Sequence, residues 1–415
     1  MRSSKVKSLR ERLVIARYWL GAFLLFSSWM NFAEAEILTA LIAERLGYMR
    51  DVAAYKWQHA LPIPDIAREQ FVIKAGMIAG LSHGVTLESS ERFYRSQIEA
   101  AKDIQRCWHL RWRLTTKPIN SVDLNSVIRP TLIDLGNSIS AHLSNTPLDA
   151  KIFNRLVQVE CLSLEAKQEI LKAAQNIRHY STRFRQIKDS GVLRVGTTGD
   201  YAPFSFSANN EIFTGIDIDL AYEFASHLNT SVMFIQTSWP TLMADFAAGK
   251  FDIGMSGISI TDVRKRQALF SKPYHVGGKT PIARCNQIYS FSSIATIDQI
   301  GTRIIVNPGG TNQRFLDENI RQATILMFED NRDIFQQIVN GRADLMITDK
   351  IEVTLQSALH PELCGLTDNA TFTYQEKGFM MPNDSELQTK VNNWLDNTRQ
   401  NGRLQDVFDR HLSGS

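Results

Sequence analysis

Apolar residues in the first part of the chain recur at the three- and four-residue spacing of an α-helix. In the first segment they are Ile37, Leu41, Ile42, Leu46, Met49, Ala53, Trp57 and Ala60. Two prolines in residues 61–64 end this helix, Asp65 is placed to cap the next one, and Gly84 ends it. The same spacing returns in residues 88–113, 123–143 and 148–183. The pattern predicts an all-α region.

After Gly191 the pattern changes to short β-rich runs that alternate with helical spacing. The runs are residues 192–195, 232–235, 251–255, 303–306 and 344–347. This alternation is typical of an α/β domain. Residues 242–253 and 334–345 share one pattern, a helix that ends in glycine and a strand that begins with aspartate. We therefore expect two similar lobes with a ligand between them, where strand ends and helix N-termini converge.

The first 35 residues have the order of a secretory signal. Basic residues up to Arg17 precede an apolar run at 18–29, and the small residues Ala33 and Ala35 follow. The run is shorter than the ~20 residues that a membrane-spanning helix needs, and an uncleaved membrane anchor is the alternative. We expect cleavage after Ala35, which leaves an exported protein without a membrane segment. The expected parts are a signal at 1–35, an all-α domain at 36–182 and an α/β domain at 183–415.

The composition is that of a globular protein with balanced charge. Hydrophobic residues make up 44% of the 415 residues, and the length favours two or three domains. The 46 basic and 43 acidic residues leave a formal net charge of +3, part of it in the signal segment. Nothing in this balance indicates nucleic acid as a partner.

Export changes how the four cysteines are interpreted, because an oxidising compartment permits disulfides. Four cysteines allow three connectivities. Since each domain should close its own bridge, we expect Cys285 to pair with Cys364 and Cys107 with Cys161. Four free buried thiols are the alternative.

One loop in the α/β region is suited to bind an anion. Residues 307–312 (NPGGTN) follow a strand and open a helix, so their backbone N–H groups are placed to donate to a negatively charged group. An ordinary Pro-Gly turn is the alternative interpretation of these residues.

Several motifs in the α/β region resemble known families. Residues 191–204 (GVLRVGTTGDYAPF) and 215–219 (GIDID) are similar to the opening of amino-acid-type periplasmic solute-binding proteins. Further motifs lie at 237–240 (TSWP), 255–259 (MSGIS), 278–281 (GKTP), 306–312 (VNPGGTN) and 359–364 (LHPELC). Together they resemble cyclohexadienyl dehydratase over residues 183–415. The resemblance implies a two-lobed fold of the type II periplasmic-binding-protein class, with lobes at 183–276 plus 377–415 and at 277–376.

The resemblance implies an enzyme that takes prephenate or arogenate, expels the ring hydroxyl and CO2 together, and leaves an aromatic ring. Such an enzyme must protonate a poor leaving group, which requires a carboxylic acid kept neutral by a dry pocket. Glu352 matches the family's general acid, and Arg264 matches the arginine that pairs with a ligand carboxylate. By position alone, Glu352 would be a surface acid at a helix start and Arg264 a solvated charge. The other residues at matched binding positions are Asp200, Trp239, Ser256, Gly257, Ser259, Lys279, Asn307, Thr311 and Asp349.

Two cations in the helical region share one helix face. Arg45 and Lys56 are eleven residues apart, which at ~100° per residue places them in nearly the same direction. Met49 and Val52 lie on the same face, so the cations either snorkel from an apolar stripe to the surface or line an internal anion site. The spacing leaves both interpretations open.

The helical region resembles chorismate mutase of the all-α class, particularly its exported form. The similar motifs are residues 40–46 (ALIAERL), 52–57 (VAAYKW), 61–69 (LPIPDIARE) and 97–105 (QIEAAKDIQ). The resemblance implies that Arg45, Lys56 and Arg129 hold the carboxylates and ether oxygen of chorismate. It implies that Gln105 donates to the ether oxygen, and that Ala101 replaces the hydroxyl residue usual in the family. The residues at the substrate's hydroxyl side would be Asp65, Arg68 and Glu69.

The two resemblances together predict a bifunctional enzyme of phenylalanine biosynthesis in the bacterial periplasm. Its small-molecule substrates would be chorismate, prephenate and arogenate, and we expect a homo-oligomer. The main alternative is a periplasmic solute-binding protein of a transporter, for an amino acid or aromatic acid, with a degenerate mutase domain. A sensor module is a second alternative. The nine histidines show no metal spacing, and the chain has neither a dinucleotide glycine pattern nor a phosphate loop, so we expect no metal or other cofactor.

Overall fold

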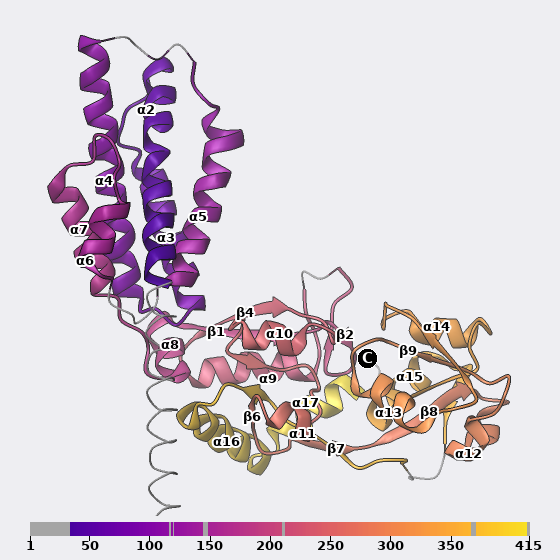
Figure 1. Ribbon diagram of the computed structural model, residues 1–415. Helices are drawn as coiled ribbons and strands as arrows, with labels where there is room; N and C mark the ends of the chain where they lie inside the picture. The colour runs from indigo at the N-terminus through magenta and orange to yellow at the C-terminus, as the bar shows by residue number, and fades with distance from the viewer. Residues whose placement is uncertain are drawn as a thin grey trace, which may run out of the picture. The chain divides into compact units, whose positions relative to one another are not determined.

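The computed structural model describes residues 34–115, 118, 120–143, 148–209, 212–366 and 371–412. The chain divides into two units, Met1–Tyr180 and Ser181–Ser415 (Figure 1). Residues 1–33 of the expected signal lie outside the described residues, and Glu34 and Ala35 already belong to the first helix. Of the helices in the described part, none is long and apolar enough to cross a membrane.

Among the residues that the structure describes, the first unit is all-α, as expected. Its elements are a helix at 34–47, α2 (Met49–Gln58), α3 (Ile66–Ser82), α4 (Leu87–Leu114), the π-helical turn η1 (Leu124–Ile128), α5 (Arg129–His142), α6 (Ala150–Leu156) and α7 (Leu164–Gln175). The long helix α4 packs against α2, α3 and α7, and α3 also packs against α5 (Figure 1). Asp65 caps α3 as expected, because its side chain accepts a hydrogen bond from the backbone N–H of Arg68 at 3.0 Å.

The single helix expected at 148–183 is wrong. After α7 the backbone pairs with the turn that follows α3, where Tyr180 N–H donates to the carbonyl of Gly84 at 2.9 Å. Between α6 and α7, Cys161 has a left-handed φ of 68° and is held by a disulfide. Ser163 then caps α7 as a separate helix. The segment is broken by contacts with distant residues, which a local periodicity does not record.

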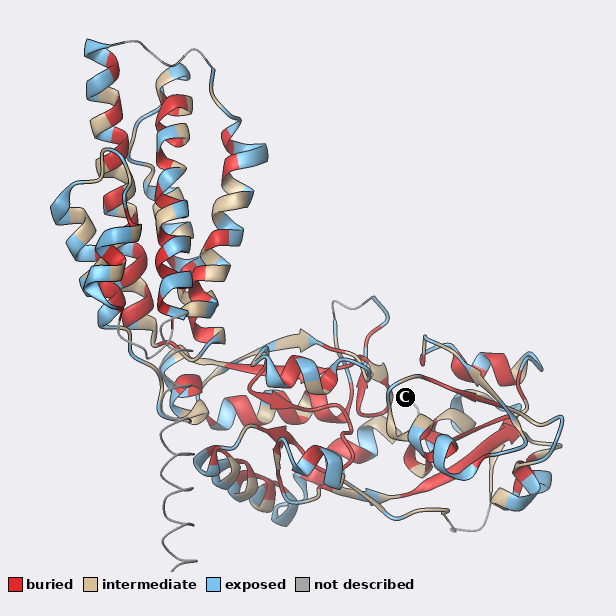
Figure 2. Ribbon diagram, in the orientation of Figure 1, coloured by how far each residue is buried: buried red, intermediate tan, exposed pale blue. Residues whose placement is uncertain are grey.

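The core of the first unit lies between the inward faces of these helices (Figure 2). Its most deeply buried apolar side chains include Ile42, Ala53, Phe93, Ile104, Ile139, Phe153 and Ile170. Each large side chain of this kind contributes about 1.5–3 kcal/mol through burial. Gly76 of α3 lies against Tyr94 of α4, and a Cβ at this position would come within 2.3 Å of the ring. The close approach of the two helices therefore requires glycine there.

The second unit contains two five-stranded sheets with the same arrangement. The first has the order β4 (Ser231–Gln236), β1 (Val192–Thr197), β5 (Ile253–Gly254), β14 (Met380–Met381) and β6 (Leu269–Phe270). The second has the order β10 (Thr324–Met327), β9 (Arg303–Val306), β11 (Leu345–Asp349), β8 (Lys279–Arg284) and β12 (Leu363–Gly365). In the spatial order of each sheet, the first three strands are parallel to one another. The last two pairings, of the fourth strand with the third and with the fifth, are antiparallel. The expected α/β fold with two similar lobes is confirmed.

Two short ribbons complete the strands. The chain leaves the first sheet through β7 (His275–Gly277) and returns through β13 (Gln375–Lys377), and these strands pair antiparallel. The second ribbon joins β2 (Asp200–Tyr201) to β3 (Ser205–Phe206). Because β7 and β13 are the crossing segments, residues near them belong to the region between the sheets.

Helices cover both sheets (Figure 1). Those around the first sheet are α8 (Arg183–Ser190), α9 (Ile216–His227), α10 (Leu242–Ala247), α11 (Asp262–Lys265), α16 (Ser385–Gln400) and α17 (Arg403–Leu412). Those around the second are the 3₁₀ turn η2 (Ile288–Phe291), α12 (Ile294–Ile297), α13 (Thr311–Asn319), α14 (Ile334–Val339) and α15 (Lys350–Leu359).

The sequence repeat corresponds to a repeated ion pair. In the first lobe Arg194 of β1 donates to Asp252 at 2.6 Å, and in the second Arg303 of β9 donates to Asp344 at 2.8 Å. Each aspartate follows a helix that ends near a glycine with positive φ, 67° and 70° respectively. Glycine adopts this conformation without strain. The shared pattern therefore marks the same helix–turn–strand unit in both lobes.

Both expected disulfides are present. Cys107 of α4 bonds to Cys161 with a Cα–Cα distance of 5.6 Å, and Cys285 bonds to Cys364 of β12 with a Cα–Cα distance of 4.7 Å. Their sequence separations are 54 and 79 residues. Each bridge closes a loop within one unit, so each restricts the unfolded chain of that unit.

Replacing Cys285 and Cys364 together by alanine should lower the free energy of unfolding of the second unit by about 4 kcal/mol, the size expected for so long a loop. Urea denaturation under non-reducing conditions measures this change. The matched control is replacement of Cys107 and Cys161 together by alanine, which opens only the bridge of the first unit and should leave the transition of the second unit unchanged. A transition midpoint that equals that of the oxidised parent would contradict a stabilising role for the bridge.

Candidate active sites

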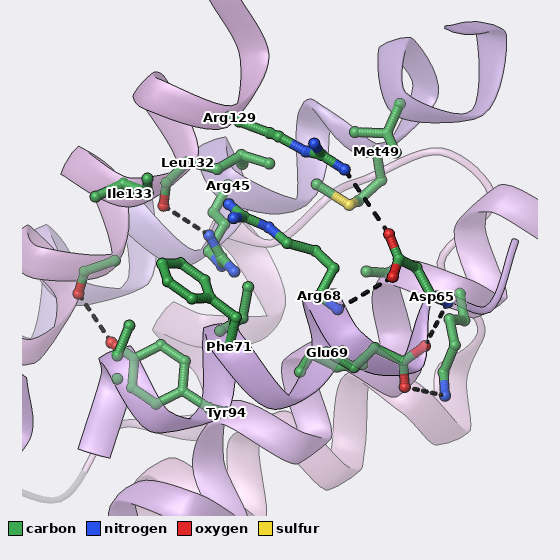
Figure 3. A pocket seen from close by; sticks show the side chains of 18 of the residues that line it. Arg45, Met49, Asp65, Arg68, Glu69, Phe71, Tyr94, Arg129, Leu132 and Ile133 are labelled. Atoms are coloured by element: carbon green, nitrogen blue, oxygen red, sulfur yellow. Dashed lines mark hydrogen bonds and ion pairs between the residues drawn. The ribbon is translucent and has the colours of Figure 1, made fainter. Parts of the chain in front are cut away.

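The first candidate site is a cavity of about 150 Å³ among the helix at 34–47, α2, α3, α4, η1 and α5 (Figure 3). The residues expected to form the mutase site all line it: Arg45, Lys56, Asp65, Arg68, Glu69, Gln105 and Arg129. Apolar residues complete its wall, among them Met49, Val52, Ile98, Leu132 and Ile133. Because Arg45 and Lys56 line this interior, they do not snorkel to the surface.

Arg45 and Lys56 are buried cations of the cavity wall. Their exposed fractions are 8% and 9%. Arg45 donates to the carbonyl of Leu132 at 2.9 Å, and Lys56 donates to the carbonyl of Ile63. In the described part of the chain, neither forms an ion pair. Burial lowers the pKa of both groups, and for Lys56 the carboxylates of Asp65 and Glu69 partly oppose this effect. Buried charges are normally paired, so this cavity is suited to an anion.

The carboxylates of the cavity gather at one end, next to Arg68 and Arg129 (Figure 3). Glu69 accepts a hydrogen bond from the backbone N–H of Asp65 at 3.2 Å and forms an ion pair with Lys102 Nζ at 3.2 Å. The guanidinium of Arg129 lies 3.7 Å from the Asp65 carboxylate. The sequence pattern did not indicate Lys102. Both carboxylates are fixed by these partners, and each keeps lone pairs that can accept a hydrogen bond from a hydroxyl group.

Gln105 faces the cavity from α4. Its Nε2 donates to the carbonyl of Ala101 at 3.0 Å, one turn earlier, while its buried Oε1 has no partner in the described residues. One amide hydrogen therefore remains available. Ala101 contributes only a methyl group. Tyr94 lines the cavity too, but its hydroxyl is engaged by Gly136 and Ser140 at 2.8 and 2.6 Å, so it presents mainly an apolar ring.

The second candidate site lies where the two sheets of the second unit meet, and Asp349 is at its centre. This carboxylate forms ion pairs with Lys279 Nζ at 2.6 Å and Lys377 Nζ at 2.7 Å. It also accepts a hydrogen bond from the Tyr201 hydroxyl. All four side chains are buried. Burial alone would raise the pKa of Asp349, but the two ammonium groups hold it below its usual range. Two cations with one anion leave this cluster with a net positive charge.

Glu352 is buried in the first turn of α15, with an exposed fraction of 1%. Burial raises the pKa of its carboxyl to about 8, and the hydrogen bond from Thr348 opposes this rise while the negative charge of Asp349 adds to it. At neutral pH the carboxyl therefore holds its proton. The alternative of a surface acid at a helix start is wrong.

Arg264 is buried in α11 rather than solvated. It donates to the carbonyl of Ser259 at 2.9 Å, and its guanidinium lies 6.0 Å from the centre of the Trp239 ring. Burial and the nearby positive charge of Arg314 lower its pKa to about 10, so it stays charged at neutral pH. Within the described ranges it has no carboxylate partner. Like Arg45 and Lys56 of the helical unit, Arg264 is therefore a buried cation that is suited to bind an anion.

Of the other residues at positions that match the dehydratase family, some line the cleft between the lobes and others are buried beside it. Trp239 donates to Asp200 at 3.1 Å, and burial raises the pKa of that carboxyl. Ser256 is fully buried and bonds to the backbone N–H and the hydroxyl of Thr198. The residues that line a cleft cavity of about 20 Å³ are Tyr201, Trp239, Gly257, Asn307, Gly310, Thr311, Asn312, Asn331, Asp349 and Lys377. Glu352 and Arg264 do not line it. A cavity of this size holds about one water molecule, so the cleft must open to admit a larger ligand.

The sequence patterns missed several residues of this cleft. Tyr201 and Asn312 lie inside motifs that were recognised, and Thr348 immediately precedes Asp349. Lys377 lies in no recognised motif, although it bonds to Asp349 and to the carbonyl of Gly257 at 2.7 Å. Only the crossing of β13 between the sheets brings it there.

These features define a two-lobed solute-binding fold that follows an all-α unit. Residues 193–414, more than half of the chain, match the bacterial extracellular solute-binding proteins, family 3. The chain belongs to this family. Residues 35–106 match chorismate mutase type II.

Relatives of the second unit include both an enzyme and binding proteins. The cyclohexadienyl dehydratase of Pseudomonas aeruginosa is 45% identical over 263 residues, which is 63% of this chain and 96% of that protein. The L-cystine-binding protein of Escherichia coli strain K12 is 24% identical over 245 residues, which is 58% of this chain and 90% of that protein. A crystal structure of an ancestral amino acid-binding protein, a precursor of cyclohexadienyl dehydratase, is 34% identical with a TM-score of 0.52, over 55% of this chain and 99% of that one.

The buried acid makes stability depend on pH. Because the pKa of Glu352 is about 8 in the folded chain and 4.5 when exposed, the unfolded chain releases this proton first, and stability falls as pH rises from 4.5 to about 8. Glu352→Gln removes the ionisable group and should stabilise the second unit by on the order of 3 kcal/mol at pH 7, with little change at pH 4.

Chemical denaturation at both pH values measures this difference. The matched control is Glu362→Gln at an exposed position, which should change stability little at either pH. Equal effects of the Glu352 substitution at pH 4 and pH 7 would show that the carboxyl is not neutral in the folded chain.

Proposed function

We propose that this chain is a bifunctional enzyme of phenylalanine biosynthesis. The helical unit rearranges chorismate to prephenate, and the second unit converts prephenate to phenylpyruvate and arogenate to phenylalanine. The observation that carries the proposal is that the second unit buries both Glu352, an acid that holds its proton at neutral pH, and the cation Arg264, for which the described residues supply no carboxylate partner. A site that only holds a ligand has no need of a neutral carboxylic acid. The family matches of both units support the same conclusion.

The mutase step needs no proton transfer. A C–O bond of chorismate breaks as a C–C bond forms within one molecule, so the protein acts by holding a compact conformer and stabilising charge on the ether oxygen. Arg45 and Arg129 are the cations for the two carboxylates. Lys56 and the free amide hydrogen of Gln105 donate to the ether oxygen. A neutral amide requires no protonation, so this step should depend little on pH.

The dehydratase step needs one proton. Glu352 donates it to the ring hydroxyl, the C–O bond breaks, and water leaves. The ring carboxylate leaves as CO2, and the electron pair of its C–C bond enters the ring, which becomes aromatic. Glu352 regains a proton from solvent afterwards. General acid catalysis of this kind contributes about 10²–10⁴-fold in rate.

Arg264 would bind the side-chain carboxylate of the substrate rather than the ring carboxylate. The ring carboxylate loses its charge when it leaves as CO2, so an ion pair with it would stabilise the ground state more than the transition state. The side-chain carboxylate keeps its charge throughout. The partner of Arg264 should therefore be the group that does not react.

A solute-binding protein is the second candidate, because the L-cystine-binding relative has a related sequence and the cleft is nearly closed. In this chain, however, Lys279 and Lys377 already neutralise Asp349, the carboxylate of the cleft. A ligand ammonium group would have to compete with both. The enzyme interpretation also accounts for the buried neutral acid Glu352 and is the one we favour.

Location, domains and assembly belong to the same proposal. The chain would act in the periplasm, which the match to extracellular solute-binding proteins and two disulfides support. Its domains would be those expected, with mutase at 36–182 and dehydratase at 183–415. A homo-oligomer would cover part of α3, which exposes Ile66, Phe71 and Ile78 by 65%, 52% and 52%.

When the purified chain is supplied with chorismate, it should form prephenate and then phenylpyruvate. Chromatography measures the amounts of both products over time. Glu352→Gln should slow the second step by about 10²–10⁴-fold and so accumulate prephenate. Lys56→Ala should lower mutase turnover by about 10²–10³-fold while added prephenate is still converted. The two variants serve as controls for each other, because each leaves one site intact.

Absence of both products, together with tight binding of an unchanged amino acid, would replace the enzyme by the binding protein. Products formed at parental rates by both variants would show instead that the wrong residues have been assigned to the two reactions.

A further inference from the structure

A directed chain of hydrogen bonds leads to the buried acid of the second unit, and it begins at Lys279. An ammonium group has three N–H donors and accepts no hydrogen bond. Lys279 is fully buried, and its three donors are used by Asp349 at 2.6 Å, the hydroxyl of Thr311 at 3.1 Å and the side chain of Asn312. Because Lys279 can only donate, the group that Asn312 turns toward it must be the amide oxygen Oδ1.

The orientation of Asn312 fixes the next bond. With Oδ1 facing Lys279, its Nδ2 faces Thr348 Oγ1 at 3.0 Å and donates to it. The threonine hydroxyl has a single hydrogen, and accepting from Asn312 leaves this hydrogen free to be donated. Its acceptor is Oε2 of Glu352. Both Thr348 and Glu352 are almost fully buried, so water does not compete for these bonds.

The direction of the chain distinguishes the two oxygens of Glu352. Oε2 accepts a hydrogen bond from Thr348, and in a protonated carboxyl the carbonyl oxygen is a better acceptor than the hydroxyl oxygen. The acidic proton is therefore favoured on Oε1, to which no residue in the described ranges donates. We propose that Thr348 and Asn312 are positioning residues of the dehydratase, which hold the acidic proton of Glu352 on Oε1 where the substrate hydroxyl takes it.

This inference rests on the proposed role of Glu352 as the general acid. The charged and titratable groups that act on this carboxyl are Asp349 beside it, Lys279 on β8, Lys377 on β13 and the hydroxyl of Tyr201 on β2. None of them donates a hydrogen bond to either oxygen of Glu352. The Thr348 bond lowers the pKa of Glu352 against the effect of burial, so its loss should raise that pKa further.

The test compares Thr348→Val, which removes the donor, with Thr348→Ser, which keeps it. Steady-state turnover of added prephenate by the full chain is measured from pH 6 to pH 10. Thr348→Val should lower kcat at least tenfold with little change in KM, and should move the loss of activity at high pH to a higher pH. Thr348→Ser should restore most of kcat and the parental pH profile. The matched control is Thr354→Val, an exposed threonine on α15, the helix of Glu352, whose hydroxyl bonds to the backbone.

Asn312→Asp supplies a second variant in case the valine variant does not fold. Aspartate has no N–H to donate to Thr348, so the threonine hydrogen turns toward it and Oε2 of Glu352 loses its donor. This variant should also lower kcat and shift the profile to higher pH. Binding of phenylpyruvate, followed by tryptophan fluorescence, reports whether each variant keeps a folded cleft.

Parental kcat and pH profile in Thr348→Val, or equal damage from valine and serine, would overturn the inference. If Glu352→Gln is inactive while both positioning variants behave like the parent, only the positioning role fails. If the parent chain does not convert prephenate at all, the proposed function fails instead.

Discussion

The cleft of the second unit depends on one buried carboxylate, Asp349, shared by two ammonium groups. Lys279 reaches it from the neighbouring strand β8, where it is the direct cross-strand partner of Asp349. Lys377 reaches it from the crossing strand β13. Removing one member of a buried cluster leaves an uncompensated charge, which costs about 3–5 kcal/mol. The three groups therefore have to be present together, and their net positive charge makes the closed cleft favourable for an anion.

Asp349 and Glu352 show how one short segment holds two carboxyl groups in opposite states. Both are buried, but Asp349 forms ion pairs with two ammonium groups, whereas Glu352 accepts a hydrogen bond from a hydroxyl, and burial and the charge of Asp349 outweigh the more distant effect of Lys279 and Lys377 on its pKa. The first stays ionised and the second keeps its proton. In the helical unit, none of the described residues forms an ion pair with Arg45 or Lys56, which agrees with a site for an anion whose rearrangement transfers no proton.

Local patterns were sufficient to predict the two-lobed α/β fold, because each lobe repeats one short unit. This unit consists of a helix, a glycine turn and an aspartate that bonds to the adjacent strand. The same patterns could not show that Glu352 is buried, since a glutamate in the first turn of a helix is usually solvated. Lys377 could not be found either, because no motif surrounds it and only the chain crossing places it beside Asp349. The break at Cys161 depends on a disulfide to a distant helix. In each case the missing information is a contact between residues far apart in sequence.

A binding-protein fold suits a reaction that needs a neutral acid. Burial keeps the carboxyl of Glu352 protonated in the folded second unit. When the lobes separate to release product, water reaches the same group and its pKa falls toward the ordinary value. Closing again around a dianionic substrate removes that water, and the carboxyl takes up a proton as it is buried. The movement that captures a ligand in a binding protein would thus also restore the proton of the acid in an enzyme.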